Sequence, residues 1–319
     1  MICNEIYDGQ GLGNQLWNYV LARLIADHKH CDFSIIGTHK FKGKGFMELD
    51  FGVQLPGGES PEGGPPTKLP DGIEHYYREK KEVHCSLNID ISRTDENIFN
   101  IPLNTKFDGN CQSTKYLDGK KEKIKEWLKI KHEYQSIKPP DNICLIHLRC
   151  GDFYFQHQVF LQLSYYVNAI NHIKSINPDV VFWCVTDQPD VAHQFLNGNV
   201  NLNVNIVGSS LNNRDTYAAS HHYGGDVGVD FCLMMNAKYL IIPNSSFSWW
   251  AGYLSKAQII IAPKYWAHFN VSDGYWSTSD IITDEFTYID RNGHISLPEQ
   301  CWIERKQYEN NNKEIFKLI

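Results

Sequence analysis

The chain has 319 residues, of which 42% are hydrophobic and 21% are charged, and it carries a formal net charge of −7. These proportions are ordinary for a soluble globular protein, and the length exceeds what a single hydrophobic core usually serves. The negative charge argues against a nucleic-acid partner, and the lack of any apolar stretch of about eighteen residues argues against a membrane anchor.

A glycine turn near the N-terminus is the first motif in the chain. The run G-Q-G-L-G-N-Q-L occupies residues 9–16, and apolar side chains then recur at helical spacing from Trp17 to Leu24. The spacing G-x-G-x-G differs from the G-x-G-x-x-G of a dinucleotide-binding turn, and residues 4–8 before it are only half apolar. The segment predicts a turn and a helix without itself identifying a ligand.

Three shifts in composition divide the chain. Proline and glycine crowd residues 56–66, which predicts a surface loop. The lysine-rich run at residues 120–131 predicts the solvated face of an amphipathic helix, and the segment K-P-P-D at residues 138–141 predicts a hinge. We therefore expect a first domain over residues 1–137, a second over 141–290, and a C-terminal tail over 291–319 that packs back on the first.

A buried strand is predicted directly after the hinge. Four apolar residues occupy positions 143–146, and polar side chains follow at the carboxyl end, which is the edge of an α/β sheet where ligands bind. Alternation points His147 and Arg149 to the same side of the strand. Arginine offers a bidentate fork to a phosphate and stays charged, so this edge suits an anion. The alternative is a surface pair of Arg149 and Asp152 that ends the strand.

Strands and helices alternate through the rest of the second half. We expect helices over residues 163–176 and 230–238, and strands over 180–185, 204–207, 239–242 and 259–261. This rhythm predicts an α/β fold with a doubly wound parallel sheet.

The run N-S-S-F-S-W-W at residues 244–250 follows a predicted strand and Pro243. Its hydroxyl side chains open an amphipathic segment, so it is interpreted as a helix N-terminus. The first backbone N–H groups of a helix have no internal partner and carry partial positive charge, which suits a phosphate. The alternative is that Ser245 or Ser248 caps the helix and the tryptophans fill the core.

Together these segments resemble one family, the inverting α-1,2-fucosyltransferases of glycosyltransferase family 11, which use GDP-fucose. The family pattern G-G-L-G-N-Q-x-F-Q-Y is similar to G-L-G-N-Q-L-W-N-Y at residues 11–19, and H-x-R-R-G-D-Y is similar to H-L-R-C-G-D-F at 147–153. F-S-D-D resembles V-T-D-Q at 185–188, and the long pattern D-x-x-L-M…N-S-S-F-S-W-W resembles residues 230–250. A weaker match covers residues 111–116, and all of the matches run in family order.

Three positions depart from the family pattern. Cys150 stands where most members have a second arginine, which removes one candidate contact to a phosphate or to the acceptor. Gln188 replaces the second aspartate of F-S-D-D, and Gln10 precedes the glycine turn where glycine is usual. Related protein fucosyltransferases also have a single arginine in this motif, so the resemblance remains compatible with activity.

The resemblance implies two Rossmann-like domains that face each other across a cleft, the GT-B architecture, with GDP-fucose bound mainly by the second. It implies that His147 and Asp230 contact the guanine and that Arg149 and Ser246 contact the phosphates. Asn14 is expected on the phosphate or sugar side of the donor. The expected donor-binding residues are Gly13, Asn14, His147, Arg149, Asp230, Asn244, Ser245 and Ser246.

Fucose transfer passes through an oxocarbenium-like sugar while negative charge develops on the departing diphosphate. Many glycosyltransferases stabilise that charge with a metal held by D-x-D, but this chain has no D-x-D and no spacing of metal ligands. We therefore expect no metal cofactor, with Arg149 and the helix N-terminus at Ser245 and Ser246 in its place.

A general base must also accept the proton of the acceptor hydroxyl, or the proton must pass to a phosphate. Asp152 is the candidate catalytic base beside Arg149, although a carboxylate that orients this arginine fits the spacing equally well. Glu5 and Asp8, near the glycine turn, are the other candidates.

By resemblance, the acceptor is O2 of a terminal β-galactoside of an oligosaccharide or surface glycan. A fucosyltransferase with another linkage or a protein acceptor remains open, as does a non-catalytic glycan-binding module. Nine cysteines without C-x-x-C argue against a disulfide framework and a zinc site, and the N-terminus shows no signal peptide. These features favour a cytoplasmic location.

Overall fold

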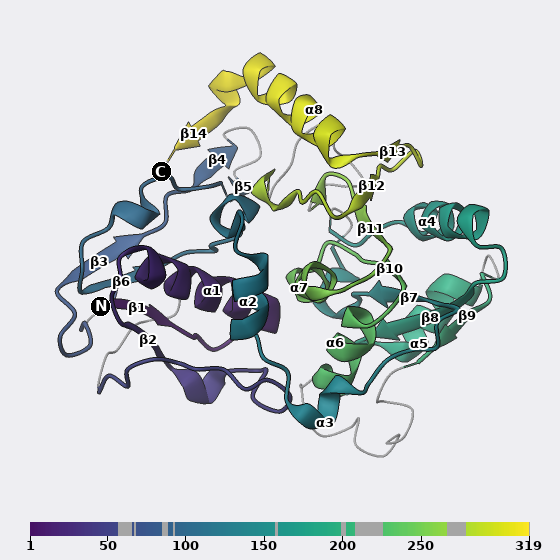
Figure 1. Cartoon of the computed structure of the whole chain (residues 1–319). Helices are drawn as coiled ribbons and strands as arrows, with labels where there is room; N and C mark the ends of the chain where they lie inside the picture. The colour runs from purple at the N-terminus through teal and green to yellow at the C-terminus, as the bar shows by residue number, and fades with distance from the viewer. Residues whose placement is uncertain are drawn as a thin grey trace. The chain divides into compact units, whose positions relative to one another are not determined.

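The computed structural model describes residues 1–56, 66, 68–84, 89–91, 93–156, 159–198, 202–207, 226–266 and 279–318 (Figure 1). The chain divides into two compact units. Unit 1 comprises Met1–Ile130, Thr278–Ile281 and Asn312–Ile319, and unit 2 comprises Lys131–Ser277 and Ile282–Asn311. Most of the predicted 56–66 loop lies outside the described residues.

Unit 1 is built on a four-stranded parallel sheet with the strand order β2-β1-β6-β3. Its strands are β1 (Ile2–Glu5), β2 (Phe33–Ile36), β3 (His75–Arg78) and β6 (Thr105–Asp108). Helix α1 (Leu12–His28) follows the glycine turn and is buried along most of its length, because apolar side chains occur on nearly every face of it. Its predicted start at the turn is confirmed.

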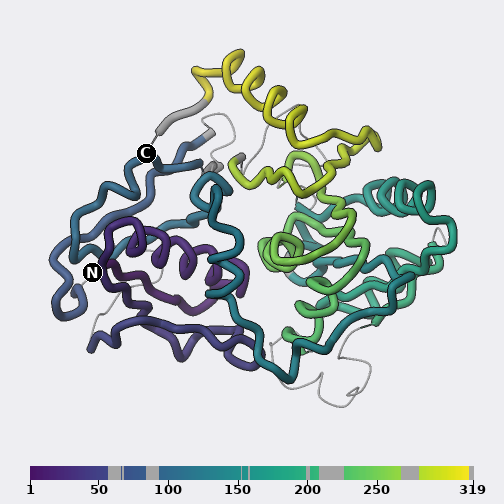
Figure 2. Tube along the Cα trace, in the orientation of Figure 1, coloured from purple at the N-terminus to yellow at the C-terminus, as the bar shows by residue number. Residues whose placement is uncertain are grey.

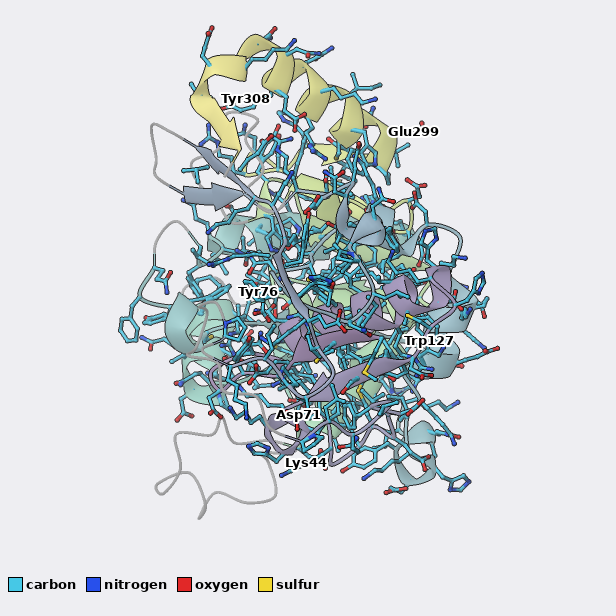
Figure 3. All side chains as sticks on the ribbon, turned by 90° about the vertical axis from the view of Figure 1, so that its left-hand side faces the viewer. Lys44, Asp71, Tyr76, Trp127, Glu299 and Tyr308 are labelled. Carbon is cyan, nitrogen blue, oxygen red and sulfur yellow. The ribbon has the colours of Figure 1, made fainter. Side chains whose placement is uncertain are left out.

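A smaller antiparallel sheet, β14-β4-β5, completes unit 1. Its strands are β4 (Glu82–His84), β5 (Ile89–Ile91) and β14 (Phe316–Leu318). The lysine-rich run forms α2 (Lys121–Trp127), which ends earlier than the predicted helix because Leu128 leaves the helical conformation and Ile130 bridges to Met47. Trp127, labelled in Figure 3, lies beneath the guanidinium of Arg23, with 4.5 Å between the guanidinium carbon and the ring centroid.

Unit 2 contains a seven-stranded sheet with the order β13-β12-β11-β10-β7-β8-β9, in which only the β12–β13 pair is antiparallel. The strands are β7 (Ile143–Leu148), β8 (Val181–Thr186), β9 (Val204–Ile206), β10 (Tyr239–Ile241), β11 (Ile259–Pro263), β12 (Thr287–Ile289) and β13 (Ile295–Ser296). The helices are α3 (His132–Gln135), α4 (Leu163–Ile176), α5 (Pro189–His193), α6 (Val227–Met235), α7 (Ser246–Leu254) and α8 (Pro298–Asn311).

The two faces of β7 pack against different helices. Cys144, Ile146 and Leu148 belong to a core cluster that includes side chains of α4 and α5. On the alternating face, the ring of His147 contacts Phe247 of α7. Figure 2 follows the chain through these crossovers. The predicted α/β class with parallel sheets is therefore confirmed.

Candidate functional site

The carboxyl end of β7 is the point where the strand order of unit 2 reverses. The chain proceeds from β7 to β8 and β9 on one side and continues through β10 to β12 on the other. Ligands of open α/β sheets bind in the crevice outside such a switch point. The register pairs Leu148 with Thr186 and Ile146 with Ile241, so the segments after all three strands emerge at one edge.

Arg149 is held at this edge by Asp187. Its Nη1 donates a hydrogen bond to Asp187 Oδ2 at 2.6 Å, while the backbone N–H of Cys150 donates to Oδ1 at 2.8 Å. The carboxylate side chain is 9% exposed and the arginine side chain 26%, so the pair is shielded while the guanidinium still reaches solvent. A fixed positive charge therefore stands at the switch point.

Cys150, at the position of the family's second arginine, is fully buried and belongs to the core cluster of unit 2. Burial raises the pKa of its thiol to about 12. This side chain packs in the core at the edge of the site and offers no positive charge to an anion.

His147 presents a neutral ring beside Arg149. Burial, and then the charge of Arg149, lower the pKa of His147 to about 3. Its ring packs edge-on against Phe247 with centroids 5.7 Å apart, and Phe247 in turn contacts Phe231 of α6 at 5.5 Å. His147 Nδ1 is buried, and none of the described residues forms a hydrogen bond with it.

Asp230, a partly buried residue, is a second group at this edge with a buried atom that lacks a hydrogen-bond partner within the described ranges. Its Oδ1 is buried and has no hydrogen bond there. Burial first, and then the charges of Asp226 and Asp187, raise the pKa of Asp230 to about 7. An unsatisfied buried acceptor costs roughly 1–3 kcal/mol, so a ligand that supplies N–H donors would stabilise this group.

The N-terminus of α7 faces the same strand ends. Ser245 is the N-cap residue, and its side chain makes no capping hydrogen bond. Ser248 Oγ instead donates to Ser245 O at 3.2 Å, and Trp249 and Trp250 are buried. The predicted core role of the tryptophans is therefore confirmed, whereas the Ser245 hydroxyl is not used as a cap. Asn244 Nδ2 donates to Val159 O at 2.8 Å, which ties α7 to the segment after Arg149.

Other predicted site residues lie elsewhere or outside the described side chains. Asp152 belongs to a short 3₁₀ turn, Gly151–Phe153, but its side chain is not among those described. Gly13 and Asn14 lie in the first turn of α1 in unit 1, where Asn14 Oδ1 accepts a hydrogen bond from Gln112 Nε2 at 3.0 Å.

The two remaining carboxylates of the glycine turn are paired within unit 1. Glu5 Oε2 lies 3.2 Å from Nζ of the fully buried Lys106, which also contacts Asp108 and the hydroxyl of Tyr7. The same ammonium lies 5.7 Å from the ring centroid of Tyr76, labelled in Figure 3. Asp8 is exposed and forms an ion pair with Lys40 at 3.0 Å.

Sequence reasoning gave no role to Asp187 or Phe247, which the structure brings to Arg149 and His147. Both fall inside recognised motifs, but their contacts depend on the register of β7 with β8 and on how α7 packs. Among the described side chains, no group of three or more His, Cys, Asp and Glu could hold a metal ion. No described helix is long and apolar enough to cross a membrane.

Comparison with known proteins gives one matching family model. Residues 107–290 match the model of glycosyl transferase family 11, a span that contains the end of β6, the whole β7 to β12 region and the site at the switch point.

Two curated proteins are similar to parts of the chain. An alpha-1,2-colitosyltransferase of Escherichia coli is 28% identical over 176 residues, which cover 50% of this chain and 56% of that protein. The protein C06E1.7 of Caenorhabditis elegans is 26% identical over 160 residues, or 47% of this chain and 43% of that protein. The chain thus spans about half the length of the curated relatives it matches.

Two solved structures align with most of the chain. NodZ alpha-1,6-fucosyltransferase co-crystallized with GDP has 16% sequence identity and a TM-score of 0.46, covering 92% of this chain and 96% of that one. A selenomethionine form of NodZ from Bradyrhizobium has 16% identity and a TM-score of 0.47, covering 92% and 97%.

Proposed function

Since this chain belongs to glycosyl transferase family 11, we propose that it is an inverting transferase that uses GDP-β-L-fucose. It moves L-fucose to O2 of a terminal β-galactoside of an oligosaccharide or surface glycan. The observation that most supports this proposal is the set of groups at the switch point of unit 2. A shielded arginine, a neutral buried histidine and a carboxyl with one buried, unsatisfied oxygen support the proposal together.

Asp230 and His147 bind the guanine. A carboxylate offers two acceptors side by side, which match the N1–H and amino group of guanine, and the buried Oδ1 of Asp230 has no described partner that would compete. The ring of His147, neutral because the pKa of His147 is about 3, packs edge-on against Phe247 and keeps its Nδ1 available as a hydrogen-bonding atom.

Arg149 and the first turn of α7 bind the diphosphate. As the bond from the sugar to the diphosphate breaks, negative charge grows on the leaving phosphate oxygens. The guanidinium and the backbone N–H groups at Ser245 and Ser246 stabilise that charge, and they do so without a metal ion. Gly13 and Asn14 complete the donor contacts on the phosphate or sugar side, and Asn244 does so beside α7.

Asp152 is the proposed general base for the acceptor hydroxyl. It removes the O2 proton as that oxygen attacks the anomeric carbon from the face opposite the diphosphate, which inverts the configuration. Glu5 and Asp8 are the alternatives, but each of these two carboxylates already forms an ion pair with a lysine.

A second donor is favoured by one observation. The Escherichia coli relative is named an alpha-1,2-colitosyltransferase, so a nucleotide-linked colitose is the runner-up donor for this chain. The name also supports transfer to O2. A fucosyltransferase with another linkage or a protein acceptor, and a glycan-binding module without catalysis, are the remaining alternatives.

The test is transfer in the presence of EDTA. Purified protein is incubated with GDP-fucose, with and without lactose or Galβ1-3GlcNAc, and released GDP and the linked product are measured. We expect galactoside-dependent GDP release and an α-1,2 product, both reduced by roughly 10²–10³ in Arg149→Ala. Arg291→Ala, at an exposed arginine of the same unit, is the matched control and should leave the rate unchanged.

The outcomes separate the alternatives. GDP binding without turnover would leave the donor site in place and contradict the acceptor or the base. Turnover only with GDP-colitose would select the second donor, and no GDP binding at all would contradict the transferase proposal.

A further inference from the structure

Asp187 makes contacts that the proposed chemistry does not yet use. Its two carboxylate oxygens accept hydrogen bonds from two consecutive residues, Oδ2 from the Arg149 guanidinium at 2.6 Å and Oδ1 from the Cys150 N–H at 2.8 Å. The side chain is 9% exposed, so both hydrogen bonds are largely screened from water. One carboxylate thereby fixes the side chain of Arg149 and the backbone that follows it.

The backbone at this point needs such an anchor. Immediately after β7, Cys150 adopts φ −98° and ψ −86°, outside regular helix and strand, and Gly151 has a positive φ of 31°. Tyr154 N–H then donates to Cys150 O at 2.9 Å across the turn that contains Gly151–Phe153. Because Cys150 N–H has left the ladder of the sheet, Asp187 supplies the acceptor that strand pairing no longer gives.

The register explains how Asp187 comes to this position. Leu148 pairs with Thr186 across two parallel strands, so the residues that follow, Arg149 and Asp187, leave adjacent strands at the same level. Thr186 Oγ1 also accepts a hydrogen bond from Gln188 N–H at 3.2 Å, which fixes the path of the segment that carries Asp187. The backbone that carries the Asp187 carboxylate is therefore also fixed by a hydrogen bond of its own segment.

We propose that Asp187 is a positioning residue that holds the Arg149 guanidinium in the orientation that receives the diphosphate of the donor. This inference rests on the proposed function. A guanidinium has five N–H donors in a rigid fork, so it can bind Asp187 along one edge and a phosphate with its other donors. A long arginine side chain that is already ordered loses less conformational freedom when the anion arrives.

The carboxylate also carries a cost, because its negative charge lies near the phosphates. Asp187 is nevertheless paired with a cation at 2.6 Å, so the net charge that the pair presents to the donor is small. Binding of the anion then depends on the geometry of the fork more than on long-range attraction. Loss of Asp187 should accordingly reduce the rate of transfer more than the affinity for GDP.

The test is a double-mutant cycle between Asp187→Asn and Arg149→Ala, with Asp190→Asn as the matched control. Asp190 is exposed on α5, three positions along the chain, and its substitution should change nothing. We expect Asp187→Asn to lower kcat/KM for GDP-fucose by roughly 10–100-fold, mostly in kcat. In the Arg149→Ala background the same change should cost less than about twofold, because no guanidinium remains to be positioned.

A rescue experiment separates positioning from mere support of the turn. Guanidinium chloride at low concentration is added to Arg149→Ala and to the double variant. Recovery of the rate in the single variant, and weaker recovery when Asp187 is also replaced, is the expected result. Asp187→Glu, which retains both acceptors on a longer side chain, should recover part of the rate and serves in the cycle if Asp187→Asn does not fold.

Additive losses in the cycle, or equal guanidinium rescue with and without Asp187, would overturn the positioning role while leaving the proposed function intact. Failure of the wild-type protein to bind GDP or to transfer fucose would instead overturn the proposed function and, with it, this inference.

Discussion

Asp230 combines a raised pKa with a buried oxygen that has no described partner, and this combination makes donor binding sensitive to pH. Its pKa is about 7 in the free protein, so half of the molecules carry a protonated carboxyl at that pH. Only the carboxylate offers both acceptors to guanine. The affinity for GDP should therefore fall by about tenfold per unit as the pH drops below 7, and should level off above it.

Calorimetric titration of GDP from about pH 5.5 to about pH 8.5 checks this prediction. Asp230→Asn cannot ionise, so its affinity should be weaker at high pH and should lose the component of the slope that belongs to this residue. Parallel profiles for the two proteins would contradict the role of Asp230. The ionisation of GDP itself affects both proteins equally, so it cancels when their two pH profiles of GDP affinity are compared.

Glu79 of unit 1 has a similar shift without any proposed role in binding. Burial raises its pKa from 4.5 to about 7, although Cys111 N–H and the Tyr116 hydroxyl donate hydrogen bonds to its two oxygens. The folded state therefore retains the proton over a range of pH where the unfolded chain has lost it. The free energy of unfolding should decrease as the pH rises from about 4.5 to about 7, by on the order of 3 kcal/mol, and then stay level.

Urea unfolding of unit 1 at several pH values measures this contribution. Glu79→Gln lacks the titrating carboxyl. The difference in unfolding free energy between variant and wild type should therefore change between about pH 4.5 and about pH 7 and be constant above pH 7. A constant difference from pH 4.5 to pH 8 would show that the carboxyl of Glu79 is already ionised in the folded state.

At the scale of elements, α6 depends on its N-cap. Asp226 Oδ1 accepts from the N–H groups of Gly228 at 2.8 Å and of Val229 at 3.4 Å, and Oδ2 accepts from the Tyr134 hydroxyl at 2.8 Å. Asp226→Ala should destabilise unit 2 by about 1 kcal/mol, measured by chemical denaturation, whereas Asp226→Asn retains the cap and should cost only a few tenths. Equal losses would mean that the cap does not hold the helix.

The connection from β2 to the following turn requires glycine at one position. Gly37 has a φ of 69°, and a Cβ placed there would lie 2.5 Å from the carbonyl oxygen of Ile6. Gly37→Ala should therefore cost about 1–3 kcal/mol of stability. Gly45→Ala is the control, because a Cβ at Gly45 meets nothing within 4 Å. Thermal unfolding of both variants compares them, and similar melting temperatures would contradict the strain at Gly37.

Elements with a strong pattern were predictable from sequence, and those set by tertiary contacts were not. The spacing of apolar residues predicted Leu163–Ile176, which is α4. Helix α6 begins at Val227 rather than Asp230 because Asp226 caps it, and a cap acts outside the apolar pattern. Strand β6 carries the fully buried Lys106, whose charge is balanced by Asp108 on the same strand and by the distant Glu5, so no local apolar pattern identifies β6 as a central strand.

The candidate site divides in the same way. His147 and Arg149 could be predicted from the sequence because they lie at the carboxyl end of an apolar strand. The N-terminus of α7 could be predicted because serines follow a strand. The pairing of Arg149 with Asp187 required the register of β7 with β8. The buried Oδ1 and the raised pKa of Asp230 depend on the packing of α6 in the folded unit, which no spacing in the sequence records.

At the scale of the whole molecule, each unit is assembled from separate stretches of chain. Unit 1 includes Thr278–Ile281 and Asn312–Ile319 in addition to Met1–Ile130, so its parts are separated in the sequence by unit 2. In unit 1, Asp280 Oδ2 accepts hydrogen bonds from the N–H and the hydroxyl of Thr94 at 2.6 and 2.5 Å. Strand β14 pairs with β4 (Figure 1).

A chain that ends at Asn311 tests this division. It lacks β14, so the amide hydrogens of β4 should exchange faster and unit 1 should unfold at lower temperature. GDP affinity should be retained, because the proposed guanine and phosphate contacts lie mainly in unit 2. Loss of GDP binding together with the change in β4 would show that the two units do not respond independently.

The pairing of β4 with β14 also sets an order of events during synthesis. The sheet of β2, β1, β6 and β3 can form once residue 108 has left the ribosome, whereas the partner of β4 at residues 316–318 emerges only after all of unit 2. Until then the edge of β4 has no β14 to pair with, and an open edge invites pairing with another chain. Nascent or prematurely terminated chains should therefore depend on chaperones more than the finished protein does.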